Sequence, residues 1–179
     1  MDEKIIHLFI LNDCTHHCKM CCNKQYSIDE IPVVTVEELK KAETVLLTGG
    51  EPFLLDSVCN LAQRIKQQYS NVNTIYVYTC GDSLLHYLRR GNKLHHIDGV
   101  NISPKTKYDA KCVNEIFDTE IYRRQIVSLW SNRIYLFPEI KKYVYTHHMN
   151  YDCIAIMNRE WQEKFVANSG IFRRLPVLY

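Results

Sequence analysis

The residues with the most distinctive chemistry are three cysteines in a short segment near the amino terminus. Cys14, Cys18 and Cys21, here called the cysteine triplet, follow the spacing C-x3-C-x2-C in a chain that has eight cysteines in all. An iron–sulfur cluster is usually held by four cysteine thiolates, so three closely spaced cysteines would leave one iron without a protein thiolate. An open position on a metal can bind a substrate or cofactor directly. The spacing therefore predicts a metal centre that binds a further molecule.

A disulfide framework and a zinc site are the alternative interpretations. The acidic start Met1-Asp2-Glu3 has neither the basic region nor the cleavage site of an export signal. We therefore expect a reducing, cytoplasmic compartment, where clustered cysteines bind metal rather than form disulfides. A zinc ion could be bound by the cysteine triplet together with a fourth ligand from Cys22, His16 or His17.

The cysteines outside the triplet lack a paired metal spacing, so a second cluster is not expected. Most of them should be buried and behave as small hydrophobic residues. They are Cys22, Cys59, Cys80, Cys112 and Cys153.

The elements that must position these residues follow a pattern of alternating strands and helices. Short runs rich in Ile, Val, Leu and Tyr are typical of strands that are buried on both faces. The predicted strands are Lys4–Asn12, Thr44–Thr48, Thr74–Thr79, Gly99–Ser103, Arg133–Phe137 and Cys153–Met157. The predicted helices, from apolar residues at helical spacing, are Val36–Lys41, Leu55–Tyr69, Ser83–Arg90 and Glu120–Trp130. Thr35, followed three residues later by Glu38, predicts a capping box for the first helix.

This alternation implies parallel pairing through right-handed crossovers and hence an α/β fold. About six strands suffice for an open sheet or a partial (β/α)6 barrel, and are too few for a complete eight-fold barrel. In both architectures ligands bind beyond the carboxyl ends of the strands. Polar or glycine-rich loops follow four predicted strands and should converge there, which predicts an active site. These loops are Cys14–Cys22, Gly49–Pro52, Cys80–Asp82 and Ser103–Lys105.

The first two loops resemble the radical S-adenosylmethionine (radical SAM) superfamily. The C-x3-C-x2-C spacing after the first strand is that family's signature, and Leu47–Pro52, with the sequence LTGGEP, is similar to its glycine-glycine-glutamate motif. The strand–helix pattern extends the resemblance over roughly residues 4–157 and implies a partial barrel. Alone, Gly49-Gly50-Glu51 could be an ordinary strand-to-helix turn. Together the two motifs favour an iron–sulfur cluster strongly over zinc.

The resemblance implies a role for each matched residue. The cysteine triplet would ligate three irons of a 4Fe-4S cluster, and SAM would chelate the fourth through its amino and carboxyl groups. Thr48 precedes the residues Gly49–Glu51, which would hold the methionine amino group, and Met20 would contact the adenine. An electron from the cluster would cleave SAM to a 5′-deoxyadenosyl radical, which abstracts hydrogen from a substrate. No catalytic side chain is assigned, because the cofactor does the chemistry while the protein binds, orients and excludes water.

Local resemblances to two subfamilies add further candidate cofactor contacts. The cluster loop and Tyr78-Thr79-Cys80-Gly81 are similar to the activases that install a glycyl radical in anaerobic ribonucleotide reductase, which adds Thr79 to the candidates. Ser103-Pro104-Lys105 is similar to the deazaguanine synthases, whose serine helps bind SAM, and it could also begin a helix with Ser103 as the cap. Asp82 is a candidate ribose or substrate contact. The roles of His16, His17 and Cys22 stay open.

Composition sets the remaining expectations. The 179 residues are 46% hydrophobic and 23% charged, which is typical of one globular domain, and a net charge of +2 gives no broad basic surface for nucleic acid. No apolar stretch approaches the roughly 20 residues of a membrane helix. We expect a single domain over residues 1–179, with 158–179 as a carboxyl-terminal cover or lid.

The expected partners follow from the implied chemistry. They are a small-molecule or protein substrate that the sequence does not identify, and an electron donor such as flavodoxin or ferredoxin. Two other functions remain open, an activase that generates a glycyl radical on a partner protein and a non-catalytic zinc-binding module. An exposed apolar tail would mark a partner surface and favour the activase.

Overall fold

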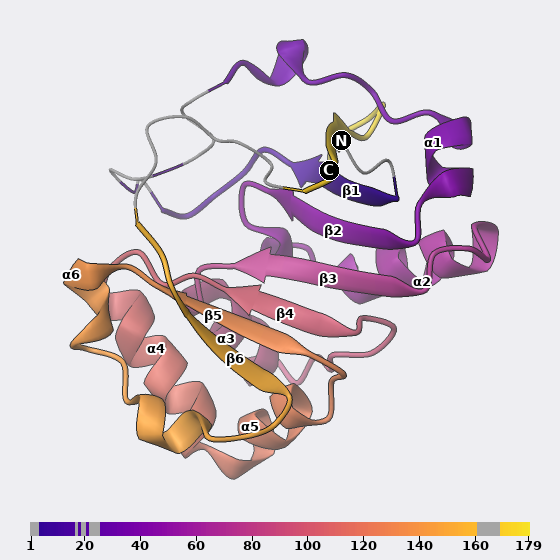
Figure 1. Cartoon of the computed structure of the whole chain (residues 1–179). Coiled ribbons are helices and arrows are strands. Elements are labelled where there is room, and N and C mark those ends of the chain that lie inside the picture. Colours follow the sequence, from indigo (N-terminus) through magenta and orange to yellow (C-terminus); the bar gives the residue numbers. More distant parts are fainter. Residues whose placement is uncertain (1–3, 17, 19–20, 22–25, 161–168) are drawn as a thin grey trace.

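The computed structural model describes residues 4–16, 18, 21, 26–160 and 169–179. Within these residues seven strands form one open sheet in which every neighbouring pair is parallel (Figure 1). The strands are β1 (Ile5–Leu11), β2 (Thr44–Gly49), β3 (Thr74–Thr79), β4 (Gly99–Ile102), β5 (Asn132–Leu136), β6 (Ile154–Asn158) and β7 (Ile171–Arg174). Their order is β6-β5-β4-β3-β2-β1-β7, so β6 and β7 are the edge strands. The predicted α/β class is confirmed.

Strands β1 to β6 lie beside one another in chain order, which determines where the helices go. Right-handed crossovers between sequential parallel strands place the connecting helices on one face of the sheet. Helices α2 and α3 lie behind the strands in the view of Figure 1. The helices are α1 (Val36–Lys41), α2 (Val58–Gln68), α3 (Asp82–Arg89), α4 (Lys107–Asp118), α5 (Glu120–Val127) and α6 (Pro138–Lys141), with 3-10 turns η2 (Ile28–Glu30), η3 (Pro52–Leu54) and η4 (Thr146–Met149). In the described part of the chain, none of them has the length and apolarity to span a membrane.

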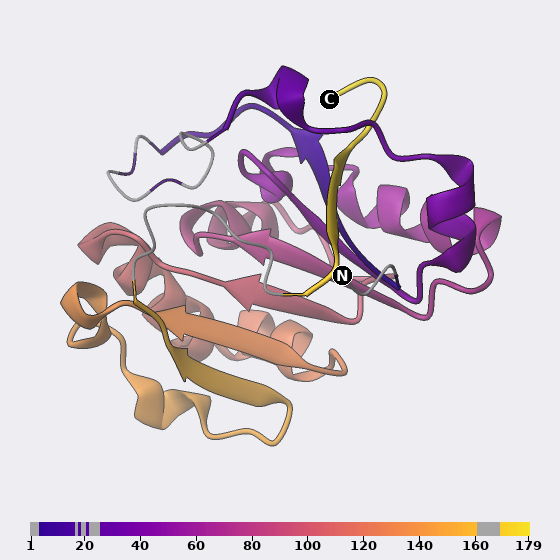
Figure 2. The same ribbon diagram turned by 45° about the horizontal axis from the view of Figure 1, so that its top comes forward.

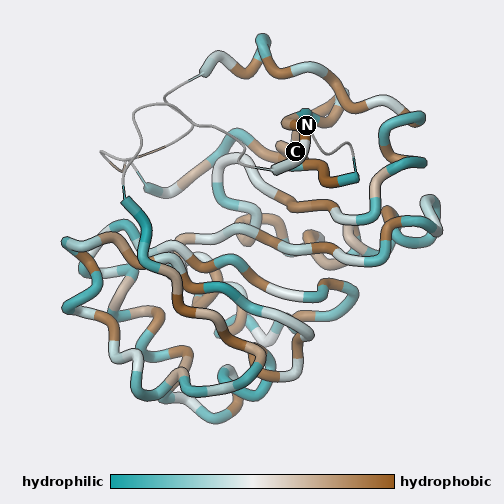
Figure 3. Tube along the Cα trace, in the orientation of Figure 1, coloured by the Kyte–Doolittle hydropathy of each residue, from teal (hydrophilic) through white to brown (hydrophobic). Residues whose placement is uncertain are grey.

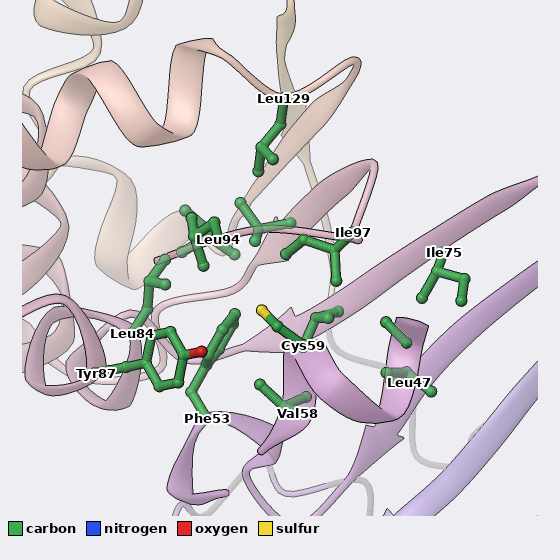
Figure 4. Packing of buried hydrophobic residues seen from close by; sticks show 14 of the residues in the cluster. Leu47, Phe53, Val58, Cys59, Ile75, Leu84, Tyr87, Leu94, Ile97 and Leu129 are labelled. Carbon is green, nitrogen blue, oxygen red and sulfur yellow. The ribbon is translucent and has the colours of Figure 1, made fainter. Parts of the chain in front are cut away.

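The core lies between the sheet and these helices. Leu8, Leu47 and Val77 stand in register on three neighbouring strands and have no exposed surface. They belong to a hydrophobic cluster that also includes residues from α2, α3, α4 and α5. In this cluster the rings of Phe53 and Tyr87 lie with their centroids 5.0 Å apart (Figure 4). Hydrophobic stretches of the chain accordingly follow the strands in Figure 3.

The opposite face of the sheet carries polar and aromatic side chains, because alternate residues of a strand point to opposite faces. Tyr78, Asn101 and Arg133 are paired neighbours on β3, β4 and β5. The His7 ring stacks on Tyr78 with 6.2 Å between centroids, and the Arg133 guanidinium lies 5.3 Å from the centroid of the Tyr76 ring. The sheet thus separates an apolar, helix-covered side from a side on which polar side chains lie among aromatic ones.

All six predicted strands are confirmed to within one residue at each end, and Thr35 and Glu38 form the predicted capping box of α1. Helices α4 and α6 and strand β7 were not predicted. Part of the segment expected as a cover or lid instead extends the sheet, since β7 pairs with β1 and places buried Ile171 opposite Ile6 (Figure 2). The strand is short and contains two arginines, so it lacks the apolar run of the other strands.

His7 on β1 is expected to make the fold sensitive to acid. Its Nε2 lies 2.9 Å from the carbonyl oxygen of Ser169, to which the ring N–H donates. Burial lowers the pKa of His7 below 6.5, the charge of Arg159 adds to this, and the hydrogen bond opposes it. Between the two pKa values of His7, the unfolded state therefore binds more protons than the folded state. The stability that neutral His7 contributes is complete above the pKa of the unfolded state, and it is lost as the pH falls toward the lower pKa of the folded state.

The variant His7→Gln keeps a donor and does not titrate. The free energy of unfolding, measured with urea at about pH 7 and about pH 5, should fall less between the two values in this variant than in the wild type. Equal losses in both proteins would contradict the assignment.

Candidate functional site

The loops after β1, β2, β3 and β4 meet at the carboxyl-terminal edge of the sheet, where the sequence predicts them to converge. In the loop after β2, the N–H of Gly50 donates a hydrogen bond of 2.5 Å to the carbonyl oxygen of Leu11 at the end of β1. The Glu51 carboxylate accepts one of 2.9 Å from the N–H of Cys80 after β3. Ser103 after β4 donates one of 2.8 Å to the carbonyl of Thr79. The four loops thus form one connected group.

The Gly49–Glu51 loop lies against the start of the cysteine loop, backbone to backbone. A Cβ added to Gly50 would stand 1.9 Å from the carbonyl oxygen of Asp13, and one added to Gly49 would stand 2.4 Å from that of Leu11. Gly49 also has a φ of +131°, a conformation that other residues rarely adopt. Contacts within the protein therefore require both glycines, whether or not a cofactor approaches them.

Glu51 is 2% exposed, and its carboxylate is held by the protein itself. It accepts from the N–H of Cys80 at 2.9 Å and from that of Phe53 at 3.4 Å, and the side chain of Thr79 also donates to it. Burial raises the pKa of Glu51, and these hydrogen bonds act in the opposite direction. Glu51 therefore fixes the β3 loop relative to the β2 loop.

His16 connects the cysteine loop to the helices that follow β3 and β4. Its Nε2 lies 2.8 Å from Oδ1 of Asp109 on α4 and 3.8 Å from Oδ2 of Asp82 on α3. Its Nδ1 lies 3.9 Å from Sγ of Cys80. Asp109 was not among the residues chosen from the sequence, although Thr106 followed by Asp109 is a capping signal that could have indicated it.

Asp82, the candidate ribose or substrate contact, is the first residue of α3 and is buried at this site. Its Oδ1 lies 3.3 Å from Nε2 of His86, one turn further along the helix, and 3.9 Å from Sγ of Cys112. Together with His16, these contacts place Asp82 among side chains of the protein within the predicted group of loops.

The cysteine triplet consists of free thiols that are each partly exposed. Burial raises the pKa of Cys14, and it raises the pKa of Cys18 to about 11, with smaller increases from neighbouring carboxylates and from the other triplet thiols. The three thiols are therefore close enough to influence one another. Three partly exposed sulfur donors on one loop fit an iron–sulfur cluster that has three thiolate ligands.

The interpretation of Ser103 as a helix cap is wrong. Helix α4 begins three residues later than that interpretation requires, with Thr106 as its N-cap. Thr106 and Asp109 exchange side-chain to backbone hydrogen bonds, a complete capping box that Ser103 cannot form from its position. The Ser103 hydroxyl instead accepts a hydrogen bond of 2.9 Å from the Lys105 ammonium, and the serine is buried.

The other candidate residues are divided between the site and the undescribed segments. Thr48 is half-buried near the end of β2, and Thr79 is buried at the end of β3. Met20, His17 and Cys22 lie outside the described residues.

Asn101 on β4 is a candidate that the sequence analysis missed. It is fully buried, and within the described residues neither atom of its side-chain amide has a hydrogen-bond partner. A buried amide without partners is where a ligand or an ordered water is expected. The signal in the sequence was a single polar residue inside the short buried strand GVNI.

No protein-family model matches the chain, and no curated protein is significantly similar to it. The function therefore has to be argued from the motifs and from the geometry of the four loops.

Proposed function

We propose that this chain is a minimal radical SAM enzyme with one 4Fe-4S cluster and a substrate still to be identified. The observation that carries the proposal is the backbone contact between the cysteine loop and the Gly49–Glu51 loop. The two motifs on which the resemblance depends lie side by side at the carboxyl ends of neighbouring strands. Ligands bind at that edge in both open and barrel-like parallel sheets.

The finer architecture in this proposal is a partial barrel of the radical SAM type. Its support is the sequential order of β1 to β6, because a doubly wound sheet would reverse its strand order. Strand β7 then extends the β1 edge of such a barrel. The polar face opposite the helices, with Asn101 near its centre, is where a substrate would lie.

The residues of the chain would bind and orient the reactants. Cys14, Cys18 and Cys21 would hold the cluster, and the Gly49–Glu51 loop would fix the cysteine loop and present backbone groups to the SAM methionine. When bound, the cluster would pass one electron from a donor such as reduced flavodoxin or ferredoxin to SAM, giving methionine and a 5′-deoxyadenosyl radical that takes hydrogen from the substrate. Met20, Thr48, Thr79, Asp82 and Ser103 remain candidate SAM contacts. A reduced cytoplasm suits such a centre.

Anaerobic reconstitution tests the proposal. Protein loaded with iron and sulfide, then supplied with dithionite and SAM, should release 5′-deoxyadenosine and methionine in equal amounts. Absence of both products, together with zinc that is bound in wild-type protein purified anaerobically and lost in Cys18→Ala, would contradict the proposal and favour the zinc-binding module. A glycyl radical signal on an added partner protein would assign the activase as the subclass.

A further inference from the structure

Among the residues that the structure describes, one group of side chains outside the cysteine triplet has the donor atoms of a metal site. His16, Cys80 and Asp109 each offer an atom that lies within 4.8 Å of the other two. They come from three segments, the cysteine loop, the β3 loop and the first turn of α4. An imidazole nitrogen, a thiolate sulfur and a carboxylate oxygen are the donors that zinc takes in proteins, and sites with three protein ligands keep a fourth position open.

The carboxylate of Asp109 is held in place for such a role. Asp109 is 0% exposed, and its Oδ2 accepts from the N–H groups of Lys105 at 2.9 Å and Thr106 at 2.8 Å. Within the described residues Oδ1 has no hydrogen bond of acceptable geometry, although His16 Nε2 lies 2.8 Å away. A buried carboxylate oxygen without an aligned donor is costly, and a cation shared with the imidazole would remove that cost.

Carboxyl groups are the main polar side chains around this group. Those of Glu51, Asp82 and Asp109 are all buried here. The basic side chains near them are His16, which faces both aspartates, His86 beside Asp82, and Lys105, whose ammonium donates to Ser103. Carboxylate oxygens are donors that a divalent cation accepts, so these surroundings suit a bound cation.

We propose that His16, Cys80 and Asp109 bind a divalent cation of the zinc class, with none of the cysteine triplet among its ligands. The Cys80 thiol loses its proton to solvent when the metal–sulfur bond forms, and the fourth position takes water or a substrate atom. The two backbone hydrogen bonds to Oδ2 orient the Asp109 carboxylate as outer-shell contacts do in metal sites. Cys80 is then a ligand rather than the small buried hydrophobic residue expected from the sequence.

The proposal does not rest on the proposed function, and its test is made in the full chain without the cluster ligands. The background protein carries Cys14→Ser, Cys18→Ser and Cys21→Ser, is freed of metal with a chelator, and is titrated anaerobically with Co(II). A bond between cobalt and a thiolate gives a charge-transfer absorption in the near ultraviolet, which identifies sulfur ligation directly. Circular dichroism and thermal melting establish that each protein is folded.

The expected result is one Co(II) per chain, with the charge-transfer absorption present in the background protein and lost on adding Cys80→Ser. The control Cys22→Ser, a cysteine beside the triplet in the sequence, should leave it intact. Asp109→Asn and His16→Gln should each weaken Co(II) binding by at least about tenfold. A folded background protein that shows no absorption, or an absorption that persists in folded Cys80→Ser protein, would overturn the site. Neither result bears on 5′-deoxyadenosine production by the wild type, so the two proposals fail separately.

Discussion

Replacing Cys18 with alanine is expected to abolish formation of 5′-deoxyadenosine, a loss of at least about a hundredfold. Three thiolates are the fewest that leave a single iron open to SAM, so the loss of one leaves two irons without protein ligands. The iron content of the anaerobically reconstituted variant should fall together with its activity. Both quantities are measured on the same preparation, iron by a colorimetric assay and the nucleoside by chromatography.

The matched control is Cys153→Ala. Cys153 is also a free, partly exposed thiol, and its Sγ lies 3.6 Å from the carbonyl oxygen of Val127. It stands just before β6, at the amino-terminal end of that strand, whereas the candidate site lies at the carboxyl ends of β1 to β4. This variant should keep wild-type iron content and product yield. Equal activity of Cys18→Ala and the control would refute cluster ligation by the triplet.

Replacing Gly50 with alanine is expected to lower the free energy of unfolding by about 2–5 kcal/mol and to reduce cluster loading. The added Cβ would stand 1.9 Å from the carbonyl oxygen of Asp13 and 2.7 Å from that of Asn12, so one loop must move away from the other. That movement breaks the hydrogen bonds that join the two loops, including the one of 2.9 Å from Glu51 N–H to Asp13. Urea unfolding of the metal-free protein and iron content after reconstitution measure the two effects.

The variant Gly91→Ala is the control, because it measures the general cost of replacing a glycine without a clash between loops. Gly91 has a φ of +82°, and nothing lies within 4 Å of the position of its added Cβ. Its replacement should cost only about 1–2 kcal/mol of backbone strain and leave cluster loading unchanged. If Gly50→Ala were no less stable than Gly91→Ala and kept its iron, the close approach of the loops would be disproved.

Several features of the site could not be derived from local sequence. Asp109, which contacts His16, lies in the first turn of α4 because that helix begins at Lys107 rather than at Pro104. The choice of cap between Thr106 and Ser103 depends on which hydrogen bonds the folded loop allows. The polar face was missed for a related reason. Its residues alternate with apolar ones in short strands, and a single polar residue within the strand GVNI does not by itself show which side chains of other strands lie beside it.

The sequence by itself determined the parallel α/β class, the six strands from β1 to β6, and the convergence of four loops at one edge. These properties follow from apolar runs within single segments and from the direction that a helical crossover imposes on the next strand. The tertiary structure alone decided that β7 pairs with β1, that Gly50 contacts Asp13, and that His16, Cys80 and Asp109 form one group. Each of these depends on contacts between segments far apart in the chain, which no local pattern of residues records.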